Sequence, residues 1–428
     1  MKESAYNLVI PLDKNRNILF NSFTKKFFYI SQRNTESCIF LLKYLNVFFD
    51  ENIKFFIDEL YKNGFIVDDD RDELAELKAN FYDYKNSKVL DLMILTTYSC
   101  NFSCWYCVQK HKGINLTNGI ELQIKKHIEQ YVLSNAIEHL TLSWFGGEPL
   151  LNVGSIQRIS EFAIDFCKKN SIGFNNVITT NGSLLSPSVI SILEKLNFTN
   201  FQITIDGDKL SHNNTRNNLL IKDSFSLILS NIAKLANSLP GAIVFVRINY
   251  TNKNLSDSLV DDLDEYLCDV KKNVSFLFRK VWQEKETQSM DDKLALIVCS
   301  LHQKGYRIVS EFDDFNIASC YVECKHHHSI FPNGCVDRCS NKDINKTRGY
   351  LDETGNIVWK EIPTECNTNV FDVKGDCTTC KFLPICMGPC PESRRKFDGI
   401  LRCQMEDKQL HFQNAIKRYC TTKEILSR

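Results

Sequence analysis

The chain has 428 residues, of which 43% are hydrophobic and 24% charged. This composition is typical of a globular protein of two or three domains, and it excludes collagen-like, wholly disordered and membrane-spanning classes. The 52 basic residues are balanced by 52 acidic ones, which argues against a nucleic-acid partner held by bulk electrostatics. The 18 cysteines are too sparse for a secreted disulfide scaffold and too many for inert core thiols.

The N-terminus shows no secretory signal, and the longest apolar stretches, such as LALIVC at 294–299, are too short to cross a membrane. We therefore expect a cytoplasmic protein without a membrane partner. In a reducing cytoplasm, clustered cysteines more often bind metal or act in catalysis than form disulfides. Eleven of them lie between Cys320 and Cys420, and three lie between Cys100 and Cys107. This clustering predicts three domains, over residues 1–85, 86–310 and 311–428.

The first 85 residues predict a small winged-helix-like domain. The apolar stretches ILFNSF (18–23) and FFYI (27–30) come first, helical patterns follow over 35–49 and 53–63, and FIV at 65–67 predicts a strand. The acidic stretch over 68–87 predicts a linker helix that ends the domain.

The segment from residue 86 to 310 alternates short β-rich stretches with amphipathic helices. Strands are predicted at 90–97, 139–146, 175–181, 200–206, 242–250 and 274–281. Helices are predicted near 120–136, 155–170, 187–196, 223–238, 256–268 and 291–304. Six strand–helix units predict an α/β fold with a parallel sheet, curved into a partial (β/α)6 barrel. Ligands of such sheets bind at the carboxyl ends of the strands.

The first chemical motif, TTYSCNFSCWYC, directly follows the first of these strands. It places Cys100, Cys104 and Cys107 in C-x3-C-x2-C spacing. Three thiolates on one loop can hold three corners of a [4Fe–4S] cluster and leave the fourth iron open for a ligand. A partial zinc site or three buried thiols are the alternatives.

The second strand ends in WFGGEP at 144–149, where Gly146 and Gly147 allow the backbone to approach a ligand closely. With the cysteine loop, this element resembles the radical SAM superfamily. The resemblance implies S-adenosylmethionine on the open iron and a 5′-deoxyadenosyl radical released by one-electron reduction. It also implies roles for single residues, although no side-chain acid or base is assigned. Glu148 pairs with the cofactor's ammonium, Ser183 and Arg216 hold its carboxylate, Asn181 lines the same pocket, and Tyr106 approaches the adenine. An ordinary turn at the glycines and a solvated Arg216 are the alternatives.

The C-terminal cysteines are similar to a SPASM domain, which carries two auxiliary [4Fe–4S] clusters. This similarity brings the total to three clusters. It assigns Cys320, Cys324, Cys339 and Cys390 to auxiliary cluster I. It assigns Cys377, Cys380, Cys386 and Cys403 to auxiliary cluster II. Cys335 is an alternative ligand of cluster I, a zinc ribbon is the competing site, and the run 326–328 of three histidines is expected in a polar loop beside a cluster.

The N-terminal segment resembles the recognition element of ribosomal-peptide maturases, in which a leader peptide adds as a strand to a sheet edge. We therefore expect a precursor peptide with a leader as substrate and an intramolecular thioether or carbon–carbon crosslink as product. An electron donor such as flavodoxin or ferredoxin would complete the reaction. A sulfatase-maturing enzyme that makes formylglycine is the alternative. Those enzymes tend to place Asp directly after the cysteine that matches Cys339, whereas this chain has Ser340. An iron–sulfur winged-helix regulator that binds DNA is the alternative from another class.

Overall fold

The structure is a computed structural model that describes residues 1–44, 51–109, 111, 113–218, 220–285, 287–310, 312, 319–363, 369–396, 400–401, 403 and 408–427. The chain forms two compact units. One contains residues 1–86, 310–324 and 364–428, and the other contains residues 87–309 and 325–363. Among the described helices, none is long and apolar enough to cross a membrane.

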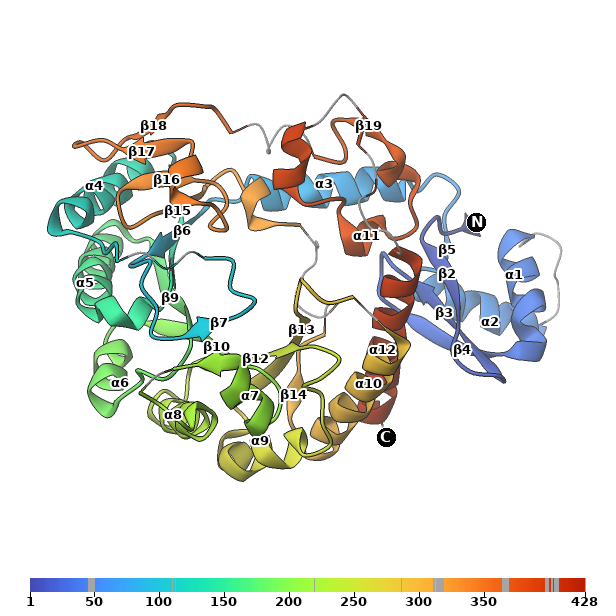
Figure 1. Cartoon of the computed structure of the whole chain (residues 1–428). Coiled ribbons are helices and arrows are strands. Elements are labelled where there is room, and N and C mark those ends of the chain that lie inside the picture. Colours follow the sequence, from blue (N-terminus) through green and yellow to red (C-terminus); the bar gives the residue numbers. More distant parts are fainter. Residues whose placement is uncertain are drawn as a thin grey trace. The chain divides into compact units, whose positions relative to one another are not determined.

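The larger unit is built on the six predicted strands, which are all present and run parallel to one another (Figure 1). They are β6 (Val89–Leu95), β8 (His139–Phe145), β9 (Gly173–Thr180), β10 (Phe198–Ile205), β12 (Ile243–Tyr250) and β13 (Val274–Lys280). A short strand, β14 (Arg307–Ile308), extends the sheet beyond β13. The strand order β14-β13-β12-β10-β9-β8-β6 follows the chain, as expected for repeated crossovers.

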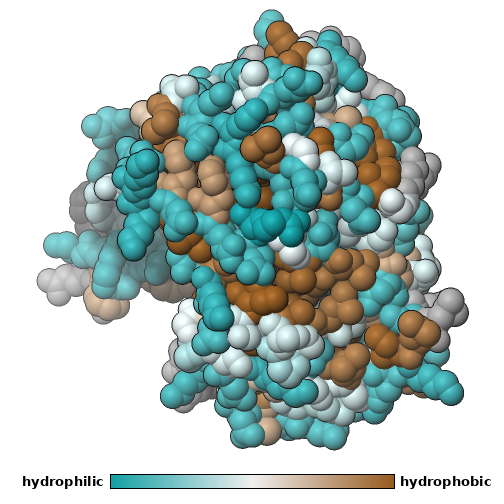
Figure 2. All heavy atoms as spheres, turned by 90° about the vertical axis from the view of Figure 1, so that its left-hand side faces the viewer, coloured by the Kyte–Doolittle hydropathy of each residue, from teal (hydrophilic) through white to brown (hydrophobic). Residues whose placement is uncertain are grey.

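Each predicted helix is also present, and Figure 1 shows these helices on the outer side of the curved sheet. They are α4 (Asn118–Ser134), α5 (Val153–Asn170), α6 (Pro187–Glu194), α8 (Ser224–Ser238), α9 (Leu259–Leu267) and α10 (Gln288–Gln303). Ser186 caps α6 by accepting a hydrogen bond from the Val189 backbone N–H, with Pro187 at the first helical position. On the face that carries α4, α5 and α6, hydrophobic side chains gather in a band among hydrophilic ones (Figure 2).

The two faces of the sheet differ in character, as β8 illustrates. Leu140, Leu142 and Trp144 are buried and belong to the main core, which also contains the inner faces of the helices. The alternate residues, such as Thr141 and Ser143, are half-buried on the inner face. The inner face therefore remains available to line a cavity.

The sheet continues beyond β6 through four strands that the sequence analysis did not predict. They are β15 (His327–Ile330), β16 (Cys335–Asp337), β17 (Gly349–Leu351) and β18 (Ile357–Trp359). β15 pairs in parallel with β6, and β16 to β18 form an antiparallel meander. His327 and His328 are buried in β15, so the expected polar loop at the histidine run was wrong.

The smaller unit begins with an antiparallel sheet of β2 (Asn7–Pro11), β3 (Arg16–Asn21) and β4 (Phe27–Ser31). It continues with α1 (Thr35–Lys43), α2 (Glu51–Lys62) and α3 (Glu73–Lys85). The part of the predicted helix over 45–49 lies outside the described residues. The predicted strand at 65–67 is β5 (Ile66–Val67), and its partner is β1 (Lys2–Glu3) rather than a neighbouring hairpin strand. The winged-helix interpretation stays a prediction.

The C-terminal segment packs into the same unit through α11 (Leu383–Cys386) and α12 (Lys408–Ser427). Ile18 and Phe20 of β3 share a hydrophobic core with Phe382 and Phe412. The first 86 residues therefore bury part of their apolar surface against the C-terminal segment. The three-domain division stays a prediction.

Candidate active site at the carboxyl ends of the strands

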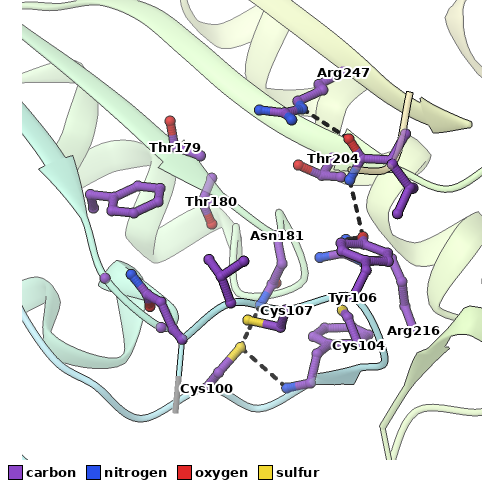
Figure 3. A pocket seen from close by; sticks show the side chains of 18 of the residues that line it. Cys100, Cys104, Tyr106, Cys107, Thr179, Thr180, Asn181, Thr204, Arg216 and Arg247 are labelled. Carbon is purple, nitrogen blue, oxygen red and sulfur yellow. Dashed lines mark hydrogen bonds between the residues drawn. The ribbon is translucent and has the colours of Figure 1, made fainter. Parts of the chain in front are cut away.

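A cavity of about 300 Å³ lies where the parallel strands of the larger unit end. Eight of the residues singled out in the sequence line it: Cys100, Cys104, Tyr106, Cys107, Gly146, Gly147, Asn181 and Arg216. They come from the loops after β6, β8 and β9 and from β11 (Arg216–Asn217). Segments more than 100 residues apart in sequence thus meet around one space (Figure 3).

The three cysteines occupy one side of this cavity (Figure 3). Cys104 lies in a short strand, β7 (Ser103–Cys104), which pairs with β11 so that Cys104 faces Arg216 in the register. The Asn181 side-chain amide lies 4.0 Å from the Cys100 sulfur. Burial raises the pKa of the Cys100 thiol to about 11 and also raises that of Cys104. Because metals bind the thiolate form, loading this site with a metal group releases protons.

The glycine pair after β8 brings two loops together. The Gly147 backbone N–H donates to the Thr97 carbonyl at 2.9 Å, and the Glu148 N–H donates to the Ser99 carbonyl at 2.8 Å. A Cβ on Gly146 would lie 2.4 Å from the Thr97 oxygen, and one on Gly147 would lie 2.2 Å from the Ser99 oxygen. Glycine is therefore required at both positions because they approach the backbone that precedes Cys100 closely. Both glycines also line the cavity.

Glu148 and Ser183 are not among the residues that line this cavity. The Glu148 carboxylate is fully buried and accepts hydrogen bonds from the Leu150 N–H (3.0 Å), the Thr180 hydroxyl (2.6 Å) and the Asn181 N–H (2.7 Å). Burial raises the pKa of Glu148, and these hydrogen bonds oppose the rise. The Ser183 hydroxyl donates to the Asn181 side chain at 2.7 Å. Their predicted contacts with the cofactor stay predictions.

Arg216 belongs to a buried polar network. Its Nη1 donates to the Tyr106 hydroxyl at 2.9 Å and lies 3.6 Å from the Asp206 carboxylate. The Tyr106 hydroxyl in turn contacts both Asp206 oxygens, at 2.7 and 2.8 Å, and accepts from the Asn249 amide at 3.1 Å. Burial raises the pKa of Asp206, and the Arg216 guanidinium opposes the rise. Arg216 is 7% exposed, so the alternative of a solvated surface charge is wrong.

The rest of the lining comes from positions that the sequence analysis did not assign. Thr179, Gln202, Thr204, Arg247, Asn249 and Lys280 all contribute. Most of them lie on the inner face of a predicted strand near its carboxyl end. The period-2 alternation carries this signal, because the inner face is made of the residues between the buried ones. Asp206, whose carboxylate contacts the Tyr106 hydroxyl, follows directly after β10.

The cysteines predicted to hold auxiliary cluster II lie together in the smaller unit. Burial raises the pKa of Cys377 to about 11, and the nearby thiols of Cys386, Cys380 and Cys403 raise it further. The parallel pairing of β19 (Lys374–Gly375) with β20 (Ile400–Leu401) sets Gly375 opposite Leu401. Cys377 comes two residues after Gly375, and Cys403 comes two residues after Leu401.

The set predicted for auxiliary cluster I is divided between the two units. Cys320, Cys324 and Cys390 lie in the smaller unit, where burial raises the pKa of Cys320 to about 11 and the other two thiols raise it further. Cys335 and Cys339 both lie in the larger unit. Among the described residues, no three His, Cys, Asp or Glu side chains lie close enough to hold a single metal ion.

The residues around the cavity in the larger unit fit a cluster with S-adenosylmethionine in three respects. Three cysteine side chains of one loop line it. The buried Arg216 Nε has no hydrogen-bond partner, so a donor is left over for a ligand. The cavity volume of about 300 Å³ lies within the range of small-molecule sites. Cys100, Cys104 and Cys107 would hold the cluster, and Asn181 and Arg216 line the same cavity.

Comparison with known proteins identifies the family of the chain. A family model described as the Radical SAM superfamily matches residues 94–263. A cysteine-type anaerobic sulfatase-maturating enzyme of Clostridium novyi is 30% identical over 352 residues, which cover 72% of this chain and 89% of that protein. The radical SAM cyclopropyl synthase TigE of Paramaledivibacter caminithermalis is 26% identical over 162 residues. That match spans only 33% of the length of either chain.

Two solved structures share the fold. One is native anSMEcpe with bound AdoMet and the Kp18Cys peptide, with a TM-score of 0.59 and 20% identity, covering 79% of this chain and 99% of that one. The other is Streptococcus suis SuiB bound to precursor peptide SuiA, with a TM-score of 0.52 and 14% identity, covering 95% and 99%. The fold is thus an α/β radical SAM fold with a mixed sheet. The chain belongs to the radical SAM superfamily and is a radical SAM enzyme.

Proposed function

We propose that this enzyme modifies a ribosomally made precursor peptide and installs an intramolecular thioether or carbon–carbon crosslink. The observation that carries the proposal is a groove in the smaller unit, beside the edge strand β4. The groove has a volume of about 920 Å³ and is lined by β4, α1 and α2. It offers a place for a leader peptide in a different unit from the candidate active site.

The groove has the features that strand addition requires. Within the described residues, β4 pairs only with β3, so its outer edge presents unpaired backbone groups. The lining is largely apolar, with Phe28 from β4, Phe40 and Leu41 from α1, and Phe56 from α2. An extended peptide on β4 would gain backbone hydrogen bonds from the strand and apolar contacts for alternate side chains. SuiB, which shares the fold, was solved with a precursor peptide.

When bound, the clusters and S-adenosylmethionine supply a 5′-deoxyadenosyl radical that takes a hydrogen atom from the substrate, and an oxidant for the surplus electron. The chain's own residues bind and orient. Cys100, Cys104 and Cys107 would hold the first cluster, and the Arg216–Tyr106 pair shapes the adjoining wall. The auxiliary sets named above would hold the other two clusters, and an external donor such as flavodoxin or ferredoxin would supply the electron that reduces the first cluster.

The test uses the reconstituted holoenzyme and synthetic copies of the short peptides encoded beside its gene. Phe40 lines the groove and is 49% exposed, so Phe40→Asp places a charge in the groove with little cost to folding. We expect leader affinity to fall about tenfold or more, equivalent to at least ~1.4 kcal/mol. The matched control is Phe55→Asp on α2, because Phe55 is 71% exposed and does not line the groove.

Leader affinity should be unchanged in the Phe55→Asp control, and cleavage of S-adenosylmethionine without peptide should be unchanged in both variants. If leader affinity falls equally in the two variants, or in neither, the groove does not bind the leader and no longer supports the proposed function. Deletion of residues 1–85 is a poorer test, because β3 shares a core with Phe382 and Phe412.

Formylglycine formation on a sulfatase is the second candidate, favoured by the match to the Clostridium novyi enzyme over 89% of its length. The two reactions differ in product. A crosslink removes two hydrogen atoms and creates no aldehyde, whereas formylglycine carries an aldehyde that hydrazine reagents capture. Mass spectrometry of the product, with and without hydrazine, separates them. A captured aldehyde on a cysteine or serine would replace the crosslinking proposal.

A further inference from the structure

Two arginines lie on the inner face of the sheet next to the candidate active site. Arg247 is on β12 and Arg279 on β13, and the parallel register places Asn249 opposite Arg279. Because side chains alternate along a strand, Arg247, Asn249 and Arg279 face the same side. Arg247 lines the cavity, and Figure 3 shows it on the opposite side from the three cysteines.

Neither arginine has an acidic partner within the part of the chain that the structure describes. The Arg247 Nε donates to the Asn249 side-chain oxygen at 2.9 Å, and the Arg279 Nη1 donates to the Phe278 carbonyl at 3.1 Å. Both contacts are to neutral oxygens. The remaining guanidinium N–H groups of Arg247 are left to face the cavity.

The surroundings add positive rather than negative charge. Lys280 also lines the cavity, and its ammonium is held by the carbonyl of Glu284. The nearby carboxylate, Asp206, is already bound by Tyr106 and Arg216. Burial and the positive charge of Arg279 lower the pKa of Arg247. Two half-buried like charges raise each other's free energy, and an anion between them would relieve that repulsion.

We propose that Arg247, which lines the cavity, and the neighbouring Arg279 form a binding site for a carboxylate of the peptide substrate. A planar guanidinium matches a carboxylate in a bidentate pair, which gives orientation as well as attraction. The site therefore selects a substrate with an acidic side chain or a free C-terminal carboxylate close to the modified residue. This inference rests on the proposed function, because it takes a peptide to be the substrate.

The cofactor's own carboxylate is the competing occupant. The amino-acid end of S-adenosylmethionine is expected at the cysteines, where Arg216 also lies. Arg247 is on the other side of the cavity in Figure 3, so the cofactor carboxylate is not expected to reach it. We therefore expect the carboxylate that binds the two arginines to come from the substrate.

The test is arginine footprinting with phenylglyoxal on the anaerobic holoenzyme saturated with S-adenosylmethionine, read at each arginine by mass spectrometry. Three probes of equal size are compared: N-acetylglutamate α-amide, N-acetylglutamine with a free α-carboxylate, and N-acetylglutamine amide. The two acids should slow modification of Arg247 and Arg279 at least threefold, and the neutral amide should not. The acid that protects better identifies a side-chain or a C-terminal carboxylate. Arg307, exposed on β14, is the reference.

The pair is tested further with Arg279→Gln, in which protection of Arg247 should be lost, and with Arg279→Lys, in which part of it should return. Equal protection by the neutral amide, protection of Arg307 as well, or protection that persists in Arg279→Gln would overturn the proposal. So would an Arg247 that never reacts, because a site closed to phenylglyoxal is closed to a peptide side chain. Protection by S-adenosylmethionine alone would assign the pair to the cofactor. No turnover is needed, so failure here leaves the proposed crosslinking untouched.

Discussion

The Glu148 carboxylate ties the end of β8 to the end of β9, since it accepts hydrogen bonds from Leu150, Thr180 and Asn181. Asn181 is also the residue whose side chain lies beside Cys100. A change at Glu148 should therefore reach the cofactor site through Asn181, even though Glu148 does not line the cavity itself.

Glu148→Ala leaves two buried backbone N–H groups without an acceptor, at a cost of about 1–3 kcal/mol each. We expect the free energy of unfolding to fall by about that sum, and S-adenosylmethionine affinity to fall about tenfold or more. Glu148→Gln retains one acceptor and should lie between the two proteins. Urea unfolding and equilibrium binding measure both quantities, with the exposed Glu161→Ala on α5 as the control. Weaker binding with unchanged stability would instead place the carboxylate on the cofactor's ammonium.

At the scale of elements, β15 is held to the rest of the larger unit by buried histidines as well as by its pairing with β6. The His127 and His328 rings lie 3.3 Å apart between Nε2 and Nδ1, and the His127 Nδ1 lies 2.9 Å from the Gly355 carbonyl. Two neutral rings satisfy this chain of hydrogen bonds, whereas two charged rings would repel each other.

This arrangement predicts sensitivity to acid. Burial lowers the pKa of His127 to about 4, and it lowers that of His328 well below its usual value. In the unfolded chain both return to about 6.5, so the unfolded state binds more protons below that pH. The free energy of unfolding should therefore fall as the pH drops from about 6.5 toward 4, by about 1.4 kcal/mol per pH unit for each proton.

Denaturant unfolding of the apoprotein between pH 7 and pH 4 measures this slope. His127→Gln removes one titrating ring and keeps a donor for the Gly355 carbonyl, so it should lower the slope by about one proton. His139→Gln, at a half-buried position on β8, is the control, because it makes the same substitution outside the His127–His328 pair. A slope that is the same in the parent and in His127→Gln would show that other groups control acid unfolding.

At the scale of the whole molecule, the groups of cysteines are distributed over the chain's two units. The Cys100 loop belongs to the larger unit, and the Cys377 group belongs to the smaller one. Ligands predicted for auxiliary cluster I come from both. The number of clusters is therefore a property that only the full-length chain can report.

Three clusters require about twelve irons and twelve sulfides per chain after anaerobic reconstitution. Replacing Cys100, Cys104 and Cys107 together with Ala should lower iron to about eight and abolish cleavage of S-adenosylmethionine. Cys268→Ala, at an exposed cysteine outside every predicted set, should change neither. Iron, sulfide and zinc analysis of each variant measures the number of clusters per chain. At most about four irons with stoichiometric zinc in the parent would contradict the SPASM assignment.

The sequence by itself determined the six strand–helix units and the loop that carries Cys100, Cys104 and Cys107. These features are local, because alternation, amphipathic spacing and caps such as Ser186 depend on neighbours a few residues apart. The parallel order of the strands then places their carboxyl ends, and the motifs that follow them, around one site.

Only the tertiary structure decided which partner each remaining segment meets. The pairing of β15 with β6 joins residues more than 200 positions apart, and no periodicity predicts it. The same holds for the burial of His328, for the inward turn of Glu148 and for the approach of Arg279 to Arg247. Each depends on a strand register or a side-chain direction that is set when distant segments pack. Packing also joined β3 to Phe382 and Phe412 in one core, because a small three-stranded sheet must cover its apolar face with another part of the chain.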